Sequence, residues 1–167
     1  MPTATKKRVR ANAFSADLCR ELSNKCKLTW KVGTAEKGIR ECVDVVGSRS
    51  GKQRVLIEVE LRRTTPLANV VKVWKRFTKE KPGEKIVFFQ AFSDFYPEKG
   101  TKRQNAEFVG KGMSDAFANV HYVPLTLHYS PKKRRLGQSA TYGGGRRRTH
   151  ARKLARRIVA KLRRIKL

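Results

Sequence analysis

Apolar residues near the start of the chain recur every fourth position. They are Phe14, Leu18, Leu22 and Cys26. This spacing places the four side chains on one face of a helix, and Ser15 stands where a capping hydroxyl is common. The pattern predicts a first helix over residues 15–26, preceded by a basic N-terminal arm over residues 1–13.

Three strand-prone stretches follow, at residues 28–32, 40–46 and 53–61. The second and third are joined by Gly-Ser-Arg-Ser-Gly-Lys, a turn-forming segment that favours a hairpin. Side chains alternate between the two faces of a strand. Glu58 and Glu60 therefore share one face of the third strand, and the opposite face carries Val55, Ile57, Val59 and Leu61.

A second helix is predicted directly after these strands. Thr65 and Pro66 form a helix-start signal, and the apolar residues that follow keep helical spacing as far as Lys-Pro-Gly-Glu-Lys. Residues 85–92 are then typical of a buried strand.

Residues 103–118 are moderately helical, and residues 120–129 indicate a last strand near a sheet edge. Together the elements predict an α/β domain with a central mixed sheet over residues 14–130. From residue 131 the composition changes, because residues 131–167 hold 15 Lys or Arg and no acid. We expect this stretch to be a basic tail that is flexible, or helical only when its charges are neutralised.

The charge balance of the chain predicts a polyanionic partner. The 167 residues include 40 Lys or Arg and 13 Asp or Glu, a formal net charge of +27. Nucleic acid is favoured over an anionic membrane surface, and DNA over RNA. No apolar stretch approaches the roughly 20 residues of a membrane-spanning helix, and the basic start of the chain lacks the apolar region of a secretory signal. We expect an intracellular, cytoplasmic protein bound to nucleic acid.

The cations expected to hold the nucleic-acid backbone lie after the third strand, on the second helix and in the basic tail. They are Arg62, Lys72, Lys75, Arg76, Lys132, Lys133, Arg134, Arg135, Arg146, Arg147, Arg148, Arg152, Lys153, Arg156 and Arg157. Contacts of this kind give affinity and salt dependence with little sequence preference.

Three acids are predicted to converge in this basic chain. A hairpin at residues 47–52 pairs Asp44 near Glu58, on the face that also carries Glu60. Carboxylates placed this close repel one another unless a cation lies among them, and Mg²⁺ is the natural cation for oxygen ligands, with Mn²⁺ as an alternative. Such a site, surrounded by Lys and Arg, is typical of a metal-dependent nuclease. The competing interpretation is a solvent-facing strand whose acids pair with nearby basic residues.

At these residues the chain resembles the PD-(D/E)xK superfamily of restriction-endonuclease-like nucleases. The resemblance covers roughly residues 14–95 and rests on the order helix, strand, two-stranded hairpin, helix, strand, with Asp44 on one strand and Glu58-Val59-Glu60 on the next. It implies that Asp44 and Glu58 ligate the metal and that Glu60 helps the metal or the attacking water.

Two further catalytic positions follow from the same resemblance. Glu21 is similar to the acid that many members carry on the first helix, and Gln90 falls where members often place a polar active-site residue. Glu60 stands where Lys is usual, although some restriction enzymes carry E-x-E, and Arg62 or Lys72 is expected to supply the positive charge.

The sequence therefore predicts a restriction-endonuclease-like core that acts as a Mg²⁺-dependent DNA nuclease. The rival hypothesis is a non-catalytic nucleic-acid-binding protein, either a degenerate nuclease fold or an RNA- or ribosome-associated protein. Cutting both strands of a duplex would favour a homodimer. Cys19, Cys26 and Cys42 show no C-x-x-C spacing and predict reduced thiols in place of a zinc site.

Overall fold

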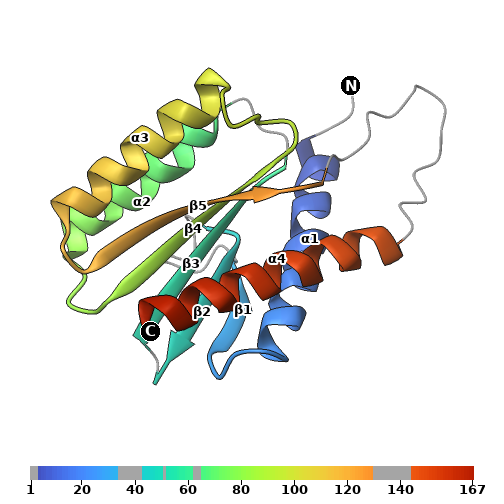
Figure 1. Ribbon diagram of the computed structural model, residues 1–167, viewed down its shortest axis with the longest axis horizontal. Coiled ribbons are helices and arrows are strands. Elements are labelled where there is room, and N and C mark those ends of the chain that lie inside the picture. Colours follow the sequence, from blue (N-terminus) through green and yellow to red (C-terminus); the bar gives the residue numbers. More distant parts are fainter. Residues whose placement is uncertain (1–3, 34–42, 51, 62–64, 130–143) are drawn as a thin grey trace.

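The computed structural model describes residues 4–33, 43–50, 52–61, 65–129 and 144–167. A five-stranded sheet in the order β1-β2-β3-β4-β5 forms its centre (Figure 1). The strands are β1 (Thr29–Val32), β2 (Val45–Arg49), β3 (Lys52–Glu60), β4 (Ile86–Ser93) and β5 (Val120–Leu127). The helices are α1 (Ala4–Ser23), α2 (Pro66–Glu80), α3 (Thr101–Ala116) and α4 (Gly144–Ile165).

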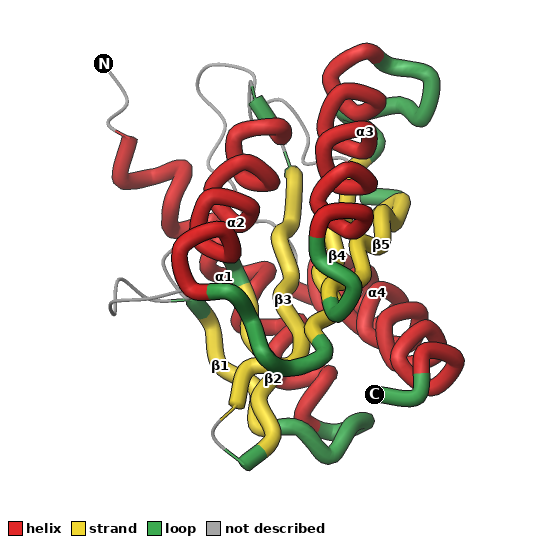
Figure 2. Tube along the Cα trace, turned by 90° about the vertical axis from the view of Figure 1, so that its left-hand side faces the viewer, coloured by secondary structure: helices red, strands yellow, loops and turns green. Residues whose placement is uncertain are grey.

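The sheet is mixed, as the sequence predicted. Strands β1, β2 and β3 pair antiparallel, whereas β3, β4 and β5 pair parallel. Parallel neighbours require crossover connections, and α2 and α3 supply them. Strand β4 has a partner on each side and helices over both faces, so all eight of its residues are buried. Figure 2 shows β3, β4 and β5 side by side beneath these helices.

Each face of the sheet is covered by a pair of helices (Figure 1). Helices α1 and α4 enclose a first core, whose members include Phe14, Leu18, Leu22, Val55, Ile57, Val59, Leu154, Ile158 and Leu162. Helices α2 and α3 enclose a second core on the other face, whose members include Leu56, Val70, Val73, Phe77, Phe88, Phe92 and Met113. The alternation predicted for β3 is confirmed, because Leu56 enters the second core while its neighbours enter the first.

The start of the chain differs from the prediction. Helix α1 begins at Ala4 and ends at Ser23, so residues 4–13, expected to form an arm, belong to the helix. Ser15 lies inside α1 and is 1% exposed, and it does not mark the start of the helix. The absence of acids at the start of the segment hides its helical character, because acids in the first turn are a usual signal of a helix N-terminus.

The predicted tail also requires correction. Residues 144–165 form α4, whose inner side is buried in the first core against the sheet and α1. The buried residues are Ala151, Leu154, Ala155, Ile158, Val159 and Leu162. A boundary at residue 131 therefore does not separate this helix from the domain. Residues 130–143, including Lys132, Lys133, Arg134 and Arg135, lie outside the described residues.

Among the described helices, none is both long enough and apolar enough to cross a membrane.

Candidate active site

Glu58 and Glu60 lie near the end of β3, on the face of the sheet that α2 and α3 cover. In the parallel pairing with β4, Glu58 is in register with Gln90 and Glu60 with Phe92. The two glutamates are 2% and 0% exposed, so the interpretation of a solvent-facing pair is wrong for both. Two carboxylates therefore lie at the edge of a hydrophobic core, where ionised groups require nearby hydrogen-bond donors or cations.

Asp44 lies immediately before β2 and beside Glu58. Val45 pairs with Ile57 where β2 begins, and Asp44 is the residue before it. The backbone N–H of Asp44 donates to the Ile57 carbonyl at 3.0 Å. The backbone N–H of Val59 donates to Asp44 Oδ2 at 2.8 Å. The side chain of Asp44 thus extends the ladder of the hairpin by one bond, which holds its carboxylate next to β3.

Glu60 is held by two amide side chains from neighbouring elements. Its Oε1 accepts hydrogen bonds from Asn69 Nδ2 on α2, at 2.8 Å, and from Gln90 Nε2 on β4, at 2.9 Å. Gln90 Nε2 also donates to the Pro66 carbonyl at 3.0 Å, which ties the first turn of α2 to β4. Gln90, a catalytic candidate from the sequence, is thus in direct contact with Glu60. Asn69, which the sequence analysis did not single out, is a polar residue among the apolar positions of α2.

Tyr122 on β5 completes this hydrogen-bond chain. Its hydroxyl donates to Gln90 Oε1 at 2.7 Å. Burial, and secondarily the nearby Glu107 carboxylate, raises the pKa of this hydroxyl, so it remains a neutral donor. The ring lies against Gly110 of α3 so closely that a Cβ there would be 2.4 Å from Tyr122 Cζ. Gly110, in the interior of α3, therefore leaves room for the ring of Tyr122, whose hydroxyl orients Gln90.

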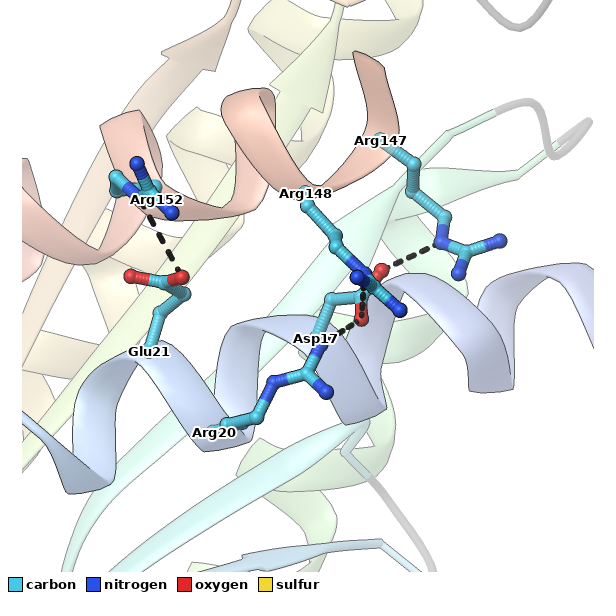
Figure 3. A network of polar contacts seen from close by, with 6 residues as sticks. All are labelled: Asp17, Arg20, Glu21, Arg147, Arg148 and Arg152. Atoms are coloured by element: carbon cyan, nitrogen blue, oxygen red, sulfur yellow. Dashed lines mark hydrogen bonds and ion pairs between the residues drawn. The ribbon is translucent and has the colours of Figure 1, made fainter. Parts of the chain in front are cut away.

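Glu21 does not join these residues. It lies on α1, in the layer on the opposite face of the sheet, and its side chain is 13% exposed. Its carboxylate pairs with Lys25 Nζ at 3.6 Å and with Arg152 Nε of α4 at 3.4 Å (Figure 3). In this structure Glu21 is a contact between two helices, and its expected position at the active site is not observed.

Asp17, one turn before Glu21, forms the centre of the same helix contact. Its carboxylate accepts hydrogen bonds from Arg20 at 2.5 Å and from Arg147 Nε at 2.6 Å, and Arg148 Nε lies 3.8 Å away (Figure 3). The Asp17 side chain is 7% exposed. Three arginines of the predicted nucleic-acid set, Arg147, Arg148 and Arg152, thus face acids of α1.

The remaining predicted cations differ in their surroundings. Lys72 and Lys75 are exposed on α2, whereas Arg76 pairs with Glu80 one turn later. On α4, Arg157 donates to the Thr126 carbonyl, while Arg146, Lys153 and Arg156 are exposed. Arg62 lies outside the described residues.

Within the described ranges, no three His, Cys, Asp or Glu side chains are arranged to hold a metal ion. Cys19 and Cys26 are free thiols of intermediate burial, and Cys42 lies outside the described residues. Burial raises the pKa of the Cys19 thiol, which keeps it protonated near neutral pH. Of the three predicted acids, Glu58 and Glu60 lie two residues apart on β3, and the Asp44 carboxylate accepts a hydrogen bond from Val59, the residue between them.

No protein-family model matches this sequence, and a search of curated proteins finds no match. The interpretation of the site therefore rests on its own geometry.

Proposed function

We propose that this protein is a Mg²⁺-dependent nuclease that hydrolyses phosphodiester bonds of DNA, with a restriction-endonuclease-like core. The observation that carries the proposal is the position of the Asp44 carboxylate, which accepts a hydrogen bond from the backbone N–H of Val59, next to the buried Glu58, in a chain of net charge +27. The order of α1, the three antiparallel strands, α2 and the parallel strand β4 supports it, because it agrees with the order of elements in that superfamily.

Two carboxylates are a sufficient protein contribution to a magnesium site. Mg²⁺ is usually bound through one or two carboxylates, and water and substrate phosphate oxygens complete its six ligands. Asp44 and Glu58 offer the required hard oxygen donors, and Mn²⁺ accepts the same donors. Such an ion, when bound, polarises a phosphoryl oxygen and lowers the pKa of a coordinated water.

The other side chains of the site position these groups. The amides of Asn69 and Gln90 fix the carboxylate of Glu60 in one orientation, from which it acts as a hydrogen-bond acceptor for the attacking water. Lys72 and Lys75, exposed on the adjacent helix α2, hold the phosphate backbone by charge.

One observation favours the alternative of a binding protein without catalysis. Glu60 occupies the position at which the superfamily usually has Lys, and its Oε1 is engaged by two amide donors. In that case the cations bind nucleic acid and the acids serve the fold. Both functions require a nucleic acid, so binding alone does not separate them.

The decisive experiment measures cleavage and binding on the same variants. Supercoiled and linear DNA are incubated with the protein in Mg²⁺, Mn²⁺ or EDTA, and DNA binding is measured by gel shift in EDTA. Asp44→Asn and Glu58→Gln change charge with little change of shape. Asp115→Asn, an exposed acid on α3, is the matched control.

The proposal predicts metal-dependent cleavage that each site variant reduces at least about 10²-fold, since several kcal/mol of transition-state stabilisation are lost. The gel shift should persist in both site variants, and the control should cleave normally. Salt-sensitive binding with no cleavage in either metal would reject the nuclease and leave the binding protein. Sedimentation of the complex on duplex DNA tests the homodimer that cutting of both strands requires.

A further inference from the structure

Helix α4 has two sides of opposite character. One side is buried in the first core, through residues that include Leu154 and Ile158. The helix also contains ten Lys or Arg and no acid. The cations on the side furthest from the core form a row, which we call the outer row: Arg146, Lys153, Arg156 and Arg164. All four are exposed, and none forms an ion pair with any described residue.

Two acids of α1 that lie beside α4 already have ion-pair partners. They are Asp17 and Glu21, and their side chains are only 7% and 13% exposed. Both pair with arginines on the flank of α4 that faces α1, including Arg147 and Arg152 (Figure 3). Some arginines of α4 therefore join it to α1, whereas those of the outer row are available to a partner.

The outer row extends along a helix that is held at both ends. Arg146 and Arg164 are 18 residues apart, which corresponds to about 27 Å along a helix. At one end the His150 ring lies 5.0 Å from the Tyr129 ring, and at the other Lys85 Nζ donates to the Ile165 carbonyl at 2.7 Å. A duplex carries one negative charge per about 1.7 Å of its axis, so this length faces many phosphates.

We propose that the outer row of α4 is a docking surface for the phosphate backbone of duplex DNA. It lies on the face of the sheet opposite Glu58 and Glu60, so it holds a stretch of duplex other than the phosphates at the candidate active site. The inference rests on the nucleic-acid binding in the proposed function, and it does not depend on catalysis.

Two features favour a duplex over other polyanions. Single-stranded nucleic acid is usually bound by aromatic side chains on which bases stack, and α4 contains no Phe, Tyr or Trp. An amphipathic helix binds a membrane by inserting its apolar side, but the apolar side of α4 is buried in the first core. A phosphate backbone requires only the exposed cations.

The test compares two variants from which the same charge has been removed. The outer-row variant carries Gln at Arg146, Lys153, Arg156 and Arg164. The control variant carries Gln at Lys27, Lys99, Lys102 and Lys111, which are exposed and lie outside α4 and α2. Binding of a fluorescent DNA duplex is followed by anisotropy in EDTA between about 50 and 200 mM salt. Thermal unfolding verifies that both variants are folded.

Each lost phosphate contact reduces the salt slope of log affinity by about 0.9. The outer-row variant should therefore lose up to about 3.6 of the slope and bind at least about tenfold more weakly at low salt, whereas the control should lose less than about one. A duplex RNA of the same length should show a similar loss, since the contacts are to phosphates.

Equal slopes for the outer-row and control variants would overturn the docking surface. A loss confined to anionic vesicles, with DNA binding unchanged, would overturn it in favour of a membrane. Because these measurements are made in EDTA, an absence of cleavage leaves their outcome unaffected. If the wild-type protein cleaves DNA but the outer-row variant keeps the salt slope of log affinity, the nuclease function stands and the docking surface is rejected.

Discussion

The side chain of Ile158 is fully buried in the contact of α4 with the sheet and α1, at 0% exposure. Ile158→Ala removes three carbons, each worth about 0.8 kcal/mol of transfer free energy, and leaves a cavity that adds to the loss. We expect the free energy of unfolding to fall by about 3 to 4 kcal/mol. For a chain of this size, the melting temperature should drop by about 6 to 16 °C.

Urea denaturation followed by tryptophan fluorescence measures this change, since Trp30 lies in the same core and is 7% exposed. Arg156→Ala, on the outer side of the same helix, is the control and should shift stability by less than about 0.5 kcal/mol. A loss below about 1 kcal/mol for Ile158→Ala would refute the burial of α4 in the core. It would also remove the rigid support on which the outer row depends.

Three other substitutions test separate contacts. Asp17→Asn should cost about 2 kcal/mol in urea denaturation, because it removes the charge that three arginines share at a 7% exposed carboxylate; an unchanged midpoint would contradict the ion-pair contact. Burial, and secondarily Lys153, lowers the pKa of His150, so the unfolded chain takes up this proton first and stability should decline as pH falls below about 6.5. His150→Gln should flatten that decline, and equal pH profiles would refute it. Gly110→Ala should cost about 1 to 3 kcal/mol in thermal unfolding by displacing the Tyr122 ring, whereas Gly112→Ala, with its nearest contact at 3.4 Å, should not destabilise the protein.

The hairpin and its acids were predictable because strand periodicity and turn chemistry act locally. Alternation along residues 53–61 fixes which face Glu58 and Glu60 share. The turn predicted at residues 47–52 is wrong, because β2 continues to Arg49 and β3 begins at Lys52, and a register shift between Gly47 and Ser48 alters the pairing in a way that turn chemistry does not reveal. The hydrogen bonds to Glu60 were harder to predict, because Gln90 and Asn69 come from elements that meet it only through tertiary packing. Tyr122 is connected to Glu60 only through Gln90. The glycine at position 110 is explained only by the Tyr122 ring that packs against it.

The assignment of α4 as a tail illustrates a limit of charge patterns. Leu154, Ile158 and Leu162 form a narrow stripe, and a narrow stripe among many arginines is typical of a surface helix. Ala151 and Ala155 widen that stripe in the structure, because small side chains allow α4 to approach α1 closely. The arginines that suggested solvent exposure include those that neutralise acids of α1. Their contacts depend on a partner helix that local periodicity does not reveal.

The contact between α1 and α4 has a consequence for how the chain folds during its synthesis. The two helices are separated by about 120 residues, and α4 supplies much of the cover for the face of the sheet that α1 shares. Contacts this distant in sequence slow folding, because a long loop must close before they form. On the ribosome, the side chains of Phe14, Leu18 and Leu22 cannot be fully buried until α4 has been translated. The nascent chain therefore exposes an apolar surface that chaperones or a bound polyanion would need to shield from aggregation.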